Sequence, residues 1–213
     1  MKLSIDNILP TYFEESRKAT SQIWGKHIEI PKGEKLHIVA PSGTGKTSLI
    51  HFLYKLRTSY SGSISYDTQD LANSNNEVLA NLRKNHISII LQDMRLFGEQ
   101  TILQNLEIKR QLNPFHPTEK IHELAAKLGI THRLNQLAKN CSYGEQQRAV
   151  IIRALLQPFD ILLMDEPFSH LDNHNTQLAL ELIIEEANTR KATVIYAELE
   201  QSSLFPTTQL LHL

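Results

Sequence analysis

The feature that most constrains the fold of this chain is the run VAPSGTGKTS at residues 39–48. It follows a β-rich apolar run, KLHIVA (35–40), and precedes leucines at helical spacing, so it joins a strand to a helix. Its two glycines let backbone N–H groups converge, and the start of the helix adds a partial positive charge. The run therefore predicts a phosphate-binding loop.

Each part of this loop has a separate predicted task. Lys46 reaches the β and γ phosphates of a nucleotide, and Thr47 ligates Mg²⁺. Gly43 and Gly45 permit close backbone approach, while Ala40 stands where a glycine is more familiar and is expected to be tolerated. The residues predicted to contact the nucleotide are Ala40, Pro41, Ser42, Gly43, Thr44, Gly45, Lys46, Thr47 and Ser48. Kinases, GTPases and many ATPases use such loops, so the loop alone does not define the reaction.

A pair of carboxylates ends another apolar run, ILLMDEP. Side chains at the carboxyl end of a parallel strand project towards a nucleotide bound at that edge of the sheet. Asp165 is therefore predicted to hold Mg²⁺ through water, and Glu166 to polarise the water that attacks the γ-phosphate. An acidic turn after a buried strand is the alternative for these two residues taken alone.

Short apolar runs alternate with helical patterns along the whole chain. They predict strands at 35–40, 86–91, 160–164, 192–197 and 208–213. The central three are apolar almost throughout, which is typical of parallel strands covered on both faces. This pattern predicts an α/β fold.

Two further regions complete the predicted architecture. The first 30 residues and the stretch 61–70 are expected to pair as an antiparallel sheet beside the core. Residues from about 93 to 155 lack strand patterns and are predicted to form a helical lobe inserted into the sheet domain. One helical stripe in that lobe ends at a glycine and consists of Ile121, Leu124, Ala125 and Leu128.

Composition excludes several classes of protein. The 213 residues include 22 Lys and Arg against 23 Asp and Glu, a net charge of −1, so no positive field favours nucleic acid or anionic lipid. The single cysteine excludes an intramolecular disulfide framework. No apolar run reaches the ~18 residues of a membrane span, and the N-terminus has no signal-peptide core. We therefore expect any link to a membrane to require a partner.

The stretch CSYGEQQR predicts the start of another helix. Ser142 and Glu145 stand in capping-box spacing ahead of a helix expected to begin near Gln146. A helix N-terminus with a serine hydroxyl and the flexible Gly144 also suits an anion that arrives from outside.

Taken together, these motifs resemble those of ATP-binding cassette (ABC) proteins, the ATPase subunits of ABC transporters, across essentially the whole chain. The matching stretches, in family order, are APSGTGKTS, the Q-loop Gln92 in ILQDMRLFGEQ, the signature CSYGEQQR, DILLMDEP, and the D-loop SHLD at 169–172.

The resemblance implies a P-loop NTPase fold of the ABC type. It has a mostly parallel sheet core (1–92 and 156–213), an antiparallel β subdomain and an inserted helical signature subdomain (about 93–155). It also implies a head-to-tail dimer, with a second copy or a paired subunit, that sandwiches two Mg-ATP. Ser142, Gly144 and Glu145 of one subunit would face the γ-phosphate held by Lys46 of the other.

The resemblance assigns further roles to single residues. Tyr12, or else Phe13, would stack on adenine. Gln92 would contact Mg²⁺ and communicate with the helical part, acting in catalysis beside Glu166 and Lys46. The segment Met94 to Phe97 would line the groove that receives a transmembrane permease subunit.

Three departures from the family pattern stand out. The alanine at position 40 is a small departure. Cys141 and Tyr143 replace the commoner leucine and glycine of the signature. In TVIYAELEQ, either Glu198 or Leu199 occupies the place of the family's switch histidine, and neither side chain can do an imidazole's work. His170 and His174 lie in or just after the D-loop, and the sequence does not indicate that either substitutes.

The expected function is a cytoplasmic ATPase subunit, peripheral on the inner face of the membrane, that hydrolyses ATP to drive a separate membrane protein. Its turnover is expected to be slow without the switch histidine. The alternatives are a nucleotide-regulated binding module with weak turnover and a soluble, non-transport ABC ATPase.

Overall fold

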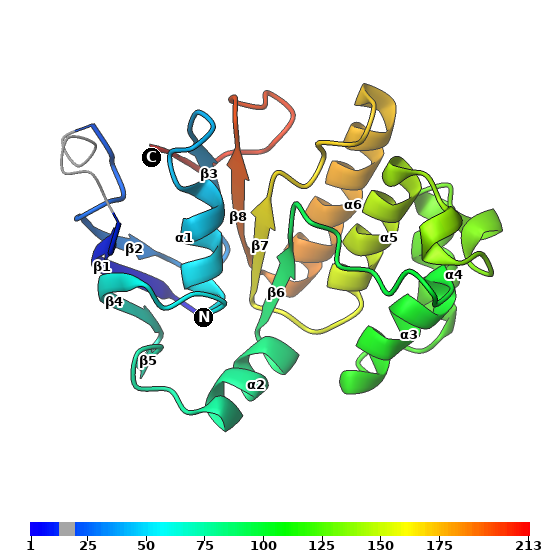
Figure 1. The fold of residues 1–213 in the computed structure, drawn as a ribbon, viewed down its shortest axis with the longest axis horizontal. Helices are drawn as coiled ribbons and strands as arrows, with labels where there is room; N and C mark the ends of the chain where they lie inside the picture. Colours follow the sequence, from blue (N-terminus) through cyan, green and yellow to red (C-terminus); the bar gives the residue numbers. More distant parts are fainter. Residues whose placement is uncertain (13–19) are drawn as a thin grey trace.

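A computed structural model describes residues 1–12 and 20–213. Its main sheet has five parallel strands in the order β6-β7-β8-β3-β9 (Figure 1). Their bounds are β3 Lys35–Val39, β6 Ile87–Ile90, β7 Ile161–Asp165, β8 Thr193–Glu198 and β9 Gln209–His212. All five predicted strands are therefore confirmed, and so is the parallel arrangement.

Both faces of this sheet are covered by apolar side chains. Along β7, Ile161 and Leu163 face one cluster while Leu162 and Met164 face another, and all four are fully buried. This two-sided burial explains the continuous apolar runs, because successive strand residues point to opposite faces. Each strand consequently holds the residues at its carboxyl end in a fixed position.

The first cluster lies between the sheet, helix α1 (Lys46–Leu53) and a second, antiparallel sheet (Figure 1). That sheet has the order β2-β1-β4-β5, with bounds β1 Leu3–Pro10, β2 His27–Ile30, β4 Tyr60–Tyr66 and β5 Gln69–Asp70. The pairing of β1 with β4 shifts register between Asp6 and Leu9. At this bulge Gly62 lies so close to the opposite backbone that a Cβ would come within 2.5 Å of the Asn7 carbonyl oxygen.

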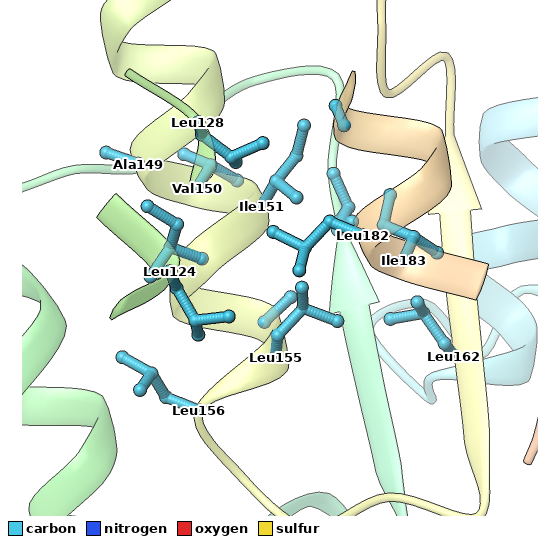
Figure 2. Packing of buried hydrophobic residues seen from close by; sticks show 14 of the residues in the cluster. Leu124, Leu128, Ala149, Val150, Ile151, Leu155, Leu156, Leu162, Leu182 and Ile183 are labelled. Atoms are coloured by element: carbon cyan, nitrogen blue, oxygen red, sulfur yellow. The ribbon is translucent and has the colours of Figure 1, made fainter. Parts of the chain in front are cut away.

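The second cluster packs the other face of the sheet against α5 (Tyr143–Leu155) and α6 (Asn173–Arg190). Figure 2 shows Ile151 and Leu155 of α5 beside Leu182 and Ile183 of α6, with Leu162 of the sheet below them. Two further helices, α3 (Ile102–Leu112) and α4 (Glu119–Lys127), pack on α5 at the end of the molecule (Figure 1). A short helix α2 (Asn76–Asn85) precedes β6.

The region from 93 to 155 contains no named strand among its residues, all of which the structure describes, as predicted. The predicted stripe of α4 is buried, and Gly129 follows it with φ 67°. One expectation is wrong: α5 begins at Tyr143, not near Gln146, because Ser142 is itself the N-cap. The cap fixes the start of the helix three residues earlier than the apolar pattern indicates.

Candidate functional site: a nucleotide pocket at the carboxyl edge of the sheet

The phosphate loop connects β3 to α1 through two glycines in left-handed conformation. Gly45, the N-cap of α1, has φ 108°, and a Cβ there would lie 3.0 Å from the ring of Trp24. Gly43 has φ 77°, but a Cβ there would meet open space. Position 45 thus excludes a side chain through both conformation and contact, whereas position 43 does so through conformation alone.

Ala40 fits its place without strain. It is buried, it does not have positive φ, and its N–H donates to the Glu198 carbonyl at 3.1 Å. The Lys46 ammonium donates to the carbonyls of Ala40 (2.7 Å) and Pro41 (3.1 Å), while the Thr44 hydroxyl also donates to Pro41 (2.8 Å). The methyl of Ala40 therefore leaves the curl of the loop and its lysine intact.

Asp165, at the end of β7, is fully buried beside this loop. Neither carboxylate oxygen makes a hydrogen bond of ordinary geometry to a described residue. Burial raises the pKa of Asp165; the nearby Thr47 hydroxyl acts in the opposite direction, and Glu166 raises it further. A buried carboxylate with no partner is costly, so this pair of oxygens suits a cation.

Glu166 links the loop to the segment after β6. Its carboxylate lies 3.4 Å from the Lys46 ammonium and accepts a hydrogen bond of 3.1 Å from Gln92 Nε2. Its own backbone has φ 44°, a conformation that costs a non-glycine residue about 1 kcal/mol or more. Its N–H is held by the Ala197 carbonyl at 3.0 Å. The carboxylate of Glu166 thus contacts the other two predicted catalytic side chains, Lys46 and Gln92.

These residues surround a pocket of about 320 Å³. Its lining consists of Tyr12, Ser42, Gly43, Gly45, Lys46, Thr47, Ser48, Gln92, Glu166 and Leu199. Tyr12 is 61% exposed, and its hydroxyl lies 2.7 Å from that of Ser48. Its hydroxyl thus lies beside the loop while most of its side chain is open to solvent, as stacking on a base requires. Phe13, the alternative for this role, lies outside the described residues.

The lining also shows which of Glu198 and Leu199 faces the phosphate loop, a choice that the sequence left open. Glu198 pairs with Val39 inside the sheet, and its carboxylate accepts hydrogen bonds from the Tyr196 hydroxyl (2.8 Å) and the Leu199 N–H (2.9 Å). Leu199, the next residue, lines the pocket instead. The side chain that faces the phosphate loop from the end of β8 is therefore an apolar one.

The signature residues form a cap at the start of α5. Ser142 Oγ accepts from the Glu145 N–H at 3.3 Å, and Glu145 accepts from the Ser142 N–H at 2.8 Å, which confirms the capping box. The Glu145 carboxylate also binds Arg133 Nε at 2.6 Å. The pKa of Glu145 is lowered because these hydrogen bonds and the arginine charge together outweigh burial. Its charge is thus already neutralised within the chain.

Within one chain the signature and the pocket stay apart. Ser142, Gly144 and Glu145 are absent from the described lining of the phosphate pocket, and Ser142 is exposed. The predicted site residues thus fall into two groups, and one chain does not bring them together.

A groove of about 190 Å³ lies beside the segment that follows Gln92. Its lining is Ile89, Phe97, Asn105, Ile108, Lys109, Leu112, Arg153 and Ala154. Three of these, Phe97, Ile108 and Leu112, are large apolar residues at least 47% exposed. Burial lowers the pKa of Lys109 to about 8, because that ammonium lies against this apolar surface.

Hydrogen bonds to main-chain atoms hold the segment from Met94 to Phe97. Arg153 donates to the carbonyls of Met94 and Arg95, both at 2.7 Å. The buried Asn105 accepts from the Phe97 N–H (2.8 Å) and donates to the Phe97 carbonyl (3.1 Å). The groove and the Gln92 segment therefore form one connected unit.

Sequence reasoning missed two contributors to the site. Trp24 is buried against Gly45, and only its spacing ahead of the antiparallel strand could have indicated a role. Arg133 neutralises Glu145 from twelve residues upstream, which a local motif does not reveal. Among the described residues, no group of three or more His, Cys, Asp or Glu could hold a metal ion. An Mg²⁺ at Thr47 and Asp165 would thus need oxygens from phosphate and water.

Comparison with known proteins places the chain in a family. Residues 25–169 match the model of the ABC transporter family. The lipoprotein-releasing system ATP-binding protein LolD 2 of Chlorobium chlorochromatii is 30% identical over 91% of this chain and 83% of its own length. The chain belongs to the ABC transporter family.

A second relative and one solved structure extend this picture. The methionine import ATP-binding protein MetN of Pasteurella multocida is 34% identical over 86% of this chain, but the match spans only 54% of that protein. The dimeric, ADP- and phosphate-bound ATP-binding cassette MJ0796 superposes with a TM-score of 0.85 at 20% identity, covering 99% of this chain and 94% of that one. The fold is that of an ABC cassette, with its parallel and antiparallel sheets.

Proposed function

We propose that this chain binds Mg-ATP and hydrolyses it. The observation that carries the proposal is the fully buried Asp165 carboxylate, which makes no hydrogen bond of ordinary geometry to a described residue, next to Glu166 in a pocket also lined by Lys46 and Gln92. The family supports the nucleotide, and relatives are named ATP-binding proteins.

The chain's own residues suit the hydrolytic step. Loop amides and the Lys46 ammonium bind the β and γ phosphates. Glu166 orients a water and accepts its proton as the water oxygen attacks the γ-phosphorus and the bond to the β-phosphate oxygen breaks, which yields ADP and phosphate. Gln92 holds the Glu166 carboxylate from the other side. Mg²⁺, held by Thr47 and Asp165 with Gln92 in reach, would neutralise phosphate charge.

The two separated groups of site residues support action as a dimer. In a head-to-tail pair, Ser142 and the N–H groups at the start of α5 of one subunit would meet the γ-phosphate in the other, whose pocket lacks them. The neighbour MJ0796 was solved as a dimer. The partner is a second copy or a paired ABC subunit.

Domain roles follow from this arrangement. We assign residues 1–92 and 156–213 to the nucleotide-binding core and about 93–155 to a helical signature subdomain. The signature helix α5 packs against β6 and α6 of the core, so the subdomain boundary crosses a shared hydrophobic cluster.

The groove around Phe97 supports coupling to a membrane protein. No helix in the described residues is long and apolar enough to cross a bilayer. Exposed apolar residues beside the Gln92 segment suit a short helix of a transmembrane permease subunit. The chain would then work in the cytoplasm, peripheral on the inner face of the membrane, and turn ATP-driven dimer closure into motion of that partner. A soluble, non-transport role would leave the groove without this partner.

Leu199 favours a second candidate, a nucleotide-regulated binding module whose turnover is weak. An apolar side chain faces the phosphate loop where the family places a histidine. Measuring Mg-dependent phosphate release together with ATP affinity separates the two. Binding with no release above a Lys46→Ala background favours the module, and release supports the ATPase.

A further inference from the structure

His170, in the D-loop, lies against the signature rather than against its own chain's phosphate pocket. Its ring is 5.4 Å from that of Tyr143, with an interplanar angle of 32°, and both residues are exposed. The backbone is equally close: a Cβ on Gly144 would lie 3.1 Å from the His170 carbonyl oxygen. Tyr143, where the family has a smaller residue, thus gives the imidazole a platform.

Two hydrogen bonds fasten the D-loop to the signature helix on either side of His170. Before it, the buried Gln147 side chain donates to the Pro167 carbonyl at 2.6 Å. After it, Arg148 Nη1 donates to Asn175 Oδ1 at 2.6 Å. His170 and Ser142 are therefore parts of one surface, and a partner that meets one also meets the other.

Among the described residues, the phosphate pocket has no imidazole of its own. Leu199 stands at the end of β8, and the described lining contains no histidine. Glu198 is occupied by hydrogen bonds to Tyr196 and to the Leu199 N–H. A neutral donor and acceptor beside the attacking water would complete the site, because preorganised hydrogen bonds of this kind lower the barrier.

We propose that His170 of one subunit enters the phosphate pocket of its partner and hydrogen-bonds the attacking water or a γ-phosphate oxygen there, in the place that Leu199 leaves apolar. This inference rests on the proposed head-to-tail ATPase dimer. The bond changes remain those of hydrolysis, and Glu166 still accepts the proton of the water. His174, also exposed and one turn further along, has no described ring contact with Tyr143 and provides the matched control.

The first test measures steady-state phosphate release. His170→Ala is expected to lower kcat at least about tenfold, with little change in ATP affinity, whereas His174→Ala keeps the wild-type rate. Leu199→His is expected to restore the rate of His170→Ala, because it places an imidazole in the same pocket from within the chain. A purely structural role for His170 would not be rescued in this way. Wild-type turnover in His170→Ala, or a loss that Leu199→His fails to restore, overturns the proposal.

The second test asks which subunit supplies the ring. In a Glu166→Gln background with Mg-ATP, a His170→Cys chain mixed with a Leu199→Cys chain should give a mixed dimer with a short bis-maleimide, and His174→Cys should give far less. The native Cys141 is buried and serves in both mixtures as the same background. Equal yields overturn the trans assignment. Absence of ATP-dependent dimers and of phosphate release in all variants, wild type included, would instead reject the proposed function on which it rests.

Discussion

Lys46 and Glu166 form an ion pair of 3.4 Å in which the lysine side chain is 4% exposed and the glutamate 13%. The pair joins the start of α1 to the end of β7, so the charge that binds phosphate and the carboxylate that handles water share one environment. Either charge alone at this place would be poorly solvated, which explains why the two sit together.

Removing the charge of Lys46 is expected to abolish function. Lys46→Ala deletes the main side-chain contact with the β and γ phosphates and should lower kcat/KM for ATP about 10²-fold or more. Nucleotide affinity and phosphate release are measured together, with the exposed Lys127→Ala as control. Unchanged ATP affinity and turnover in Lys46→Ala would contradict the assignment of this loop to the nucleotide site.

Glu166→Gln keeps the shape of the side chain and its contact with Gln92 but cannot accept the proton of water. ATP should remain bound and a closed dimer should accumulate, while phosphate release falls about 10²-fold or more. Sedimentation with and without Mg-ATP reports the dimer. Only monomer, together with a wild-type rate, would contradict both the role of Glu166 and the sandwich.

Asp165→Asn should weaken Mg-dependent ATP binding but raise the stability of the fold. Because the pKa of Asp165 in the folded chain lies above its ordinary 3.8, the folded chain binds more protons than the unfolded chain above that pH. Stability from this group is therefore full below about pH 3.8 and declines as pH rises through the higher folded pKa. Asparagine removes that decline, so the variant should be more stable than wild type at neutral pH, and it should weaken Mg-dependent ATP binding.

Urea unfolding at pH 4 and pH 7 checks this sign. Wild type and Asp165→Asn should differ more at pH 7, while the exposed Glu181→Gln should differ from wild type equally at both pH values. A stability gain that is larger at pH 4, or a loss at pH 7, would mean that Asp165 is paired in the folded chain.

The two loop glycines should respond differently to alanine. Gly43→Ala meets only an unfavourable φ and should cost about 1–2 kcal/mol of unfolding free energy. Gly45→Ala also presses against the Trp24 ring and should cost more. Ala40→Gly, at a residue without positive φ, should leave the ATPase rate essentially unchanged. Thermal unfolding and phosphate release of the three variants test this order of effects. Equal losses of unfolding free energy at positions 43 and 45 would show that the Trp24 ring moves aside without cost.

Charged substitutions in the groove should abolish binding to a membrane protein without changing the ATPase rate. Phe97→Asp and Leu112→Asp place carboxylates on the exposed apolar lining and should abolish co-purification with a membrane protein while the isolated chain keeps its ATPase rate. Gln111→Asp, on the same helix outside the lining, is the control. Undiminished co-purification of both groove variants would place the partner elsewhere.

The sequence was informative where chemistry or burial acts locally. Apolar runs predicted all five strands, and the central runs indicated a parallel sheet because both faces of strands such as β7 and β8 are covered. Ser142 with Glu145 predicted the cap of α5. It could not choose between Glu198 and Leu199, since that choice depends on where β8 ends against β3. Nor could it show Trp24 beside Gly45, because that contact joins two segments through the tertiary fold.

The hydrogen bonds of Arg153 and Asn105 to the segment after Gln92 end on backbone atoms, not on side chains. In evolutionary terms, different residues therefore determine the main-chain path of this segment and its exposed surface. The path of the main chain is set by Arg153 and Asn105, whereas the exposed surface of the segment is set by the side chains of Arg95 and Phe97, because Met94 and Leu96 pack against the core. On the proposed docking of a membrane protein in the groove, substitutions at Phe97 or Arg95 would change which partner binds, while the connection from Gln92 to the groove is inherited unchanged.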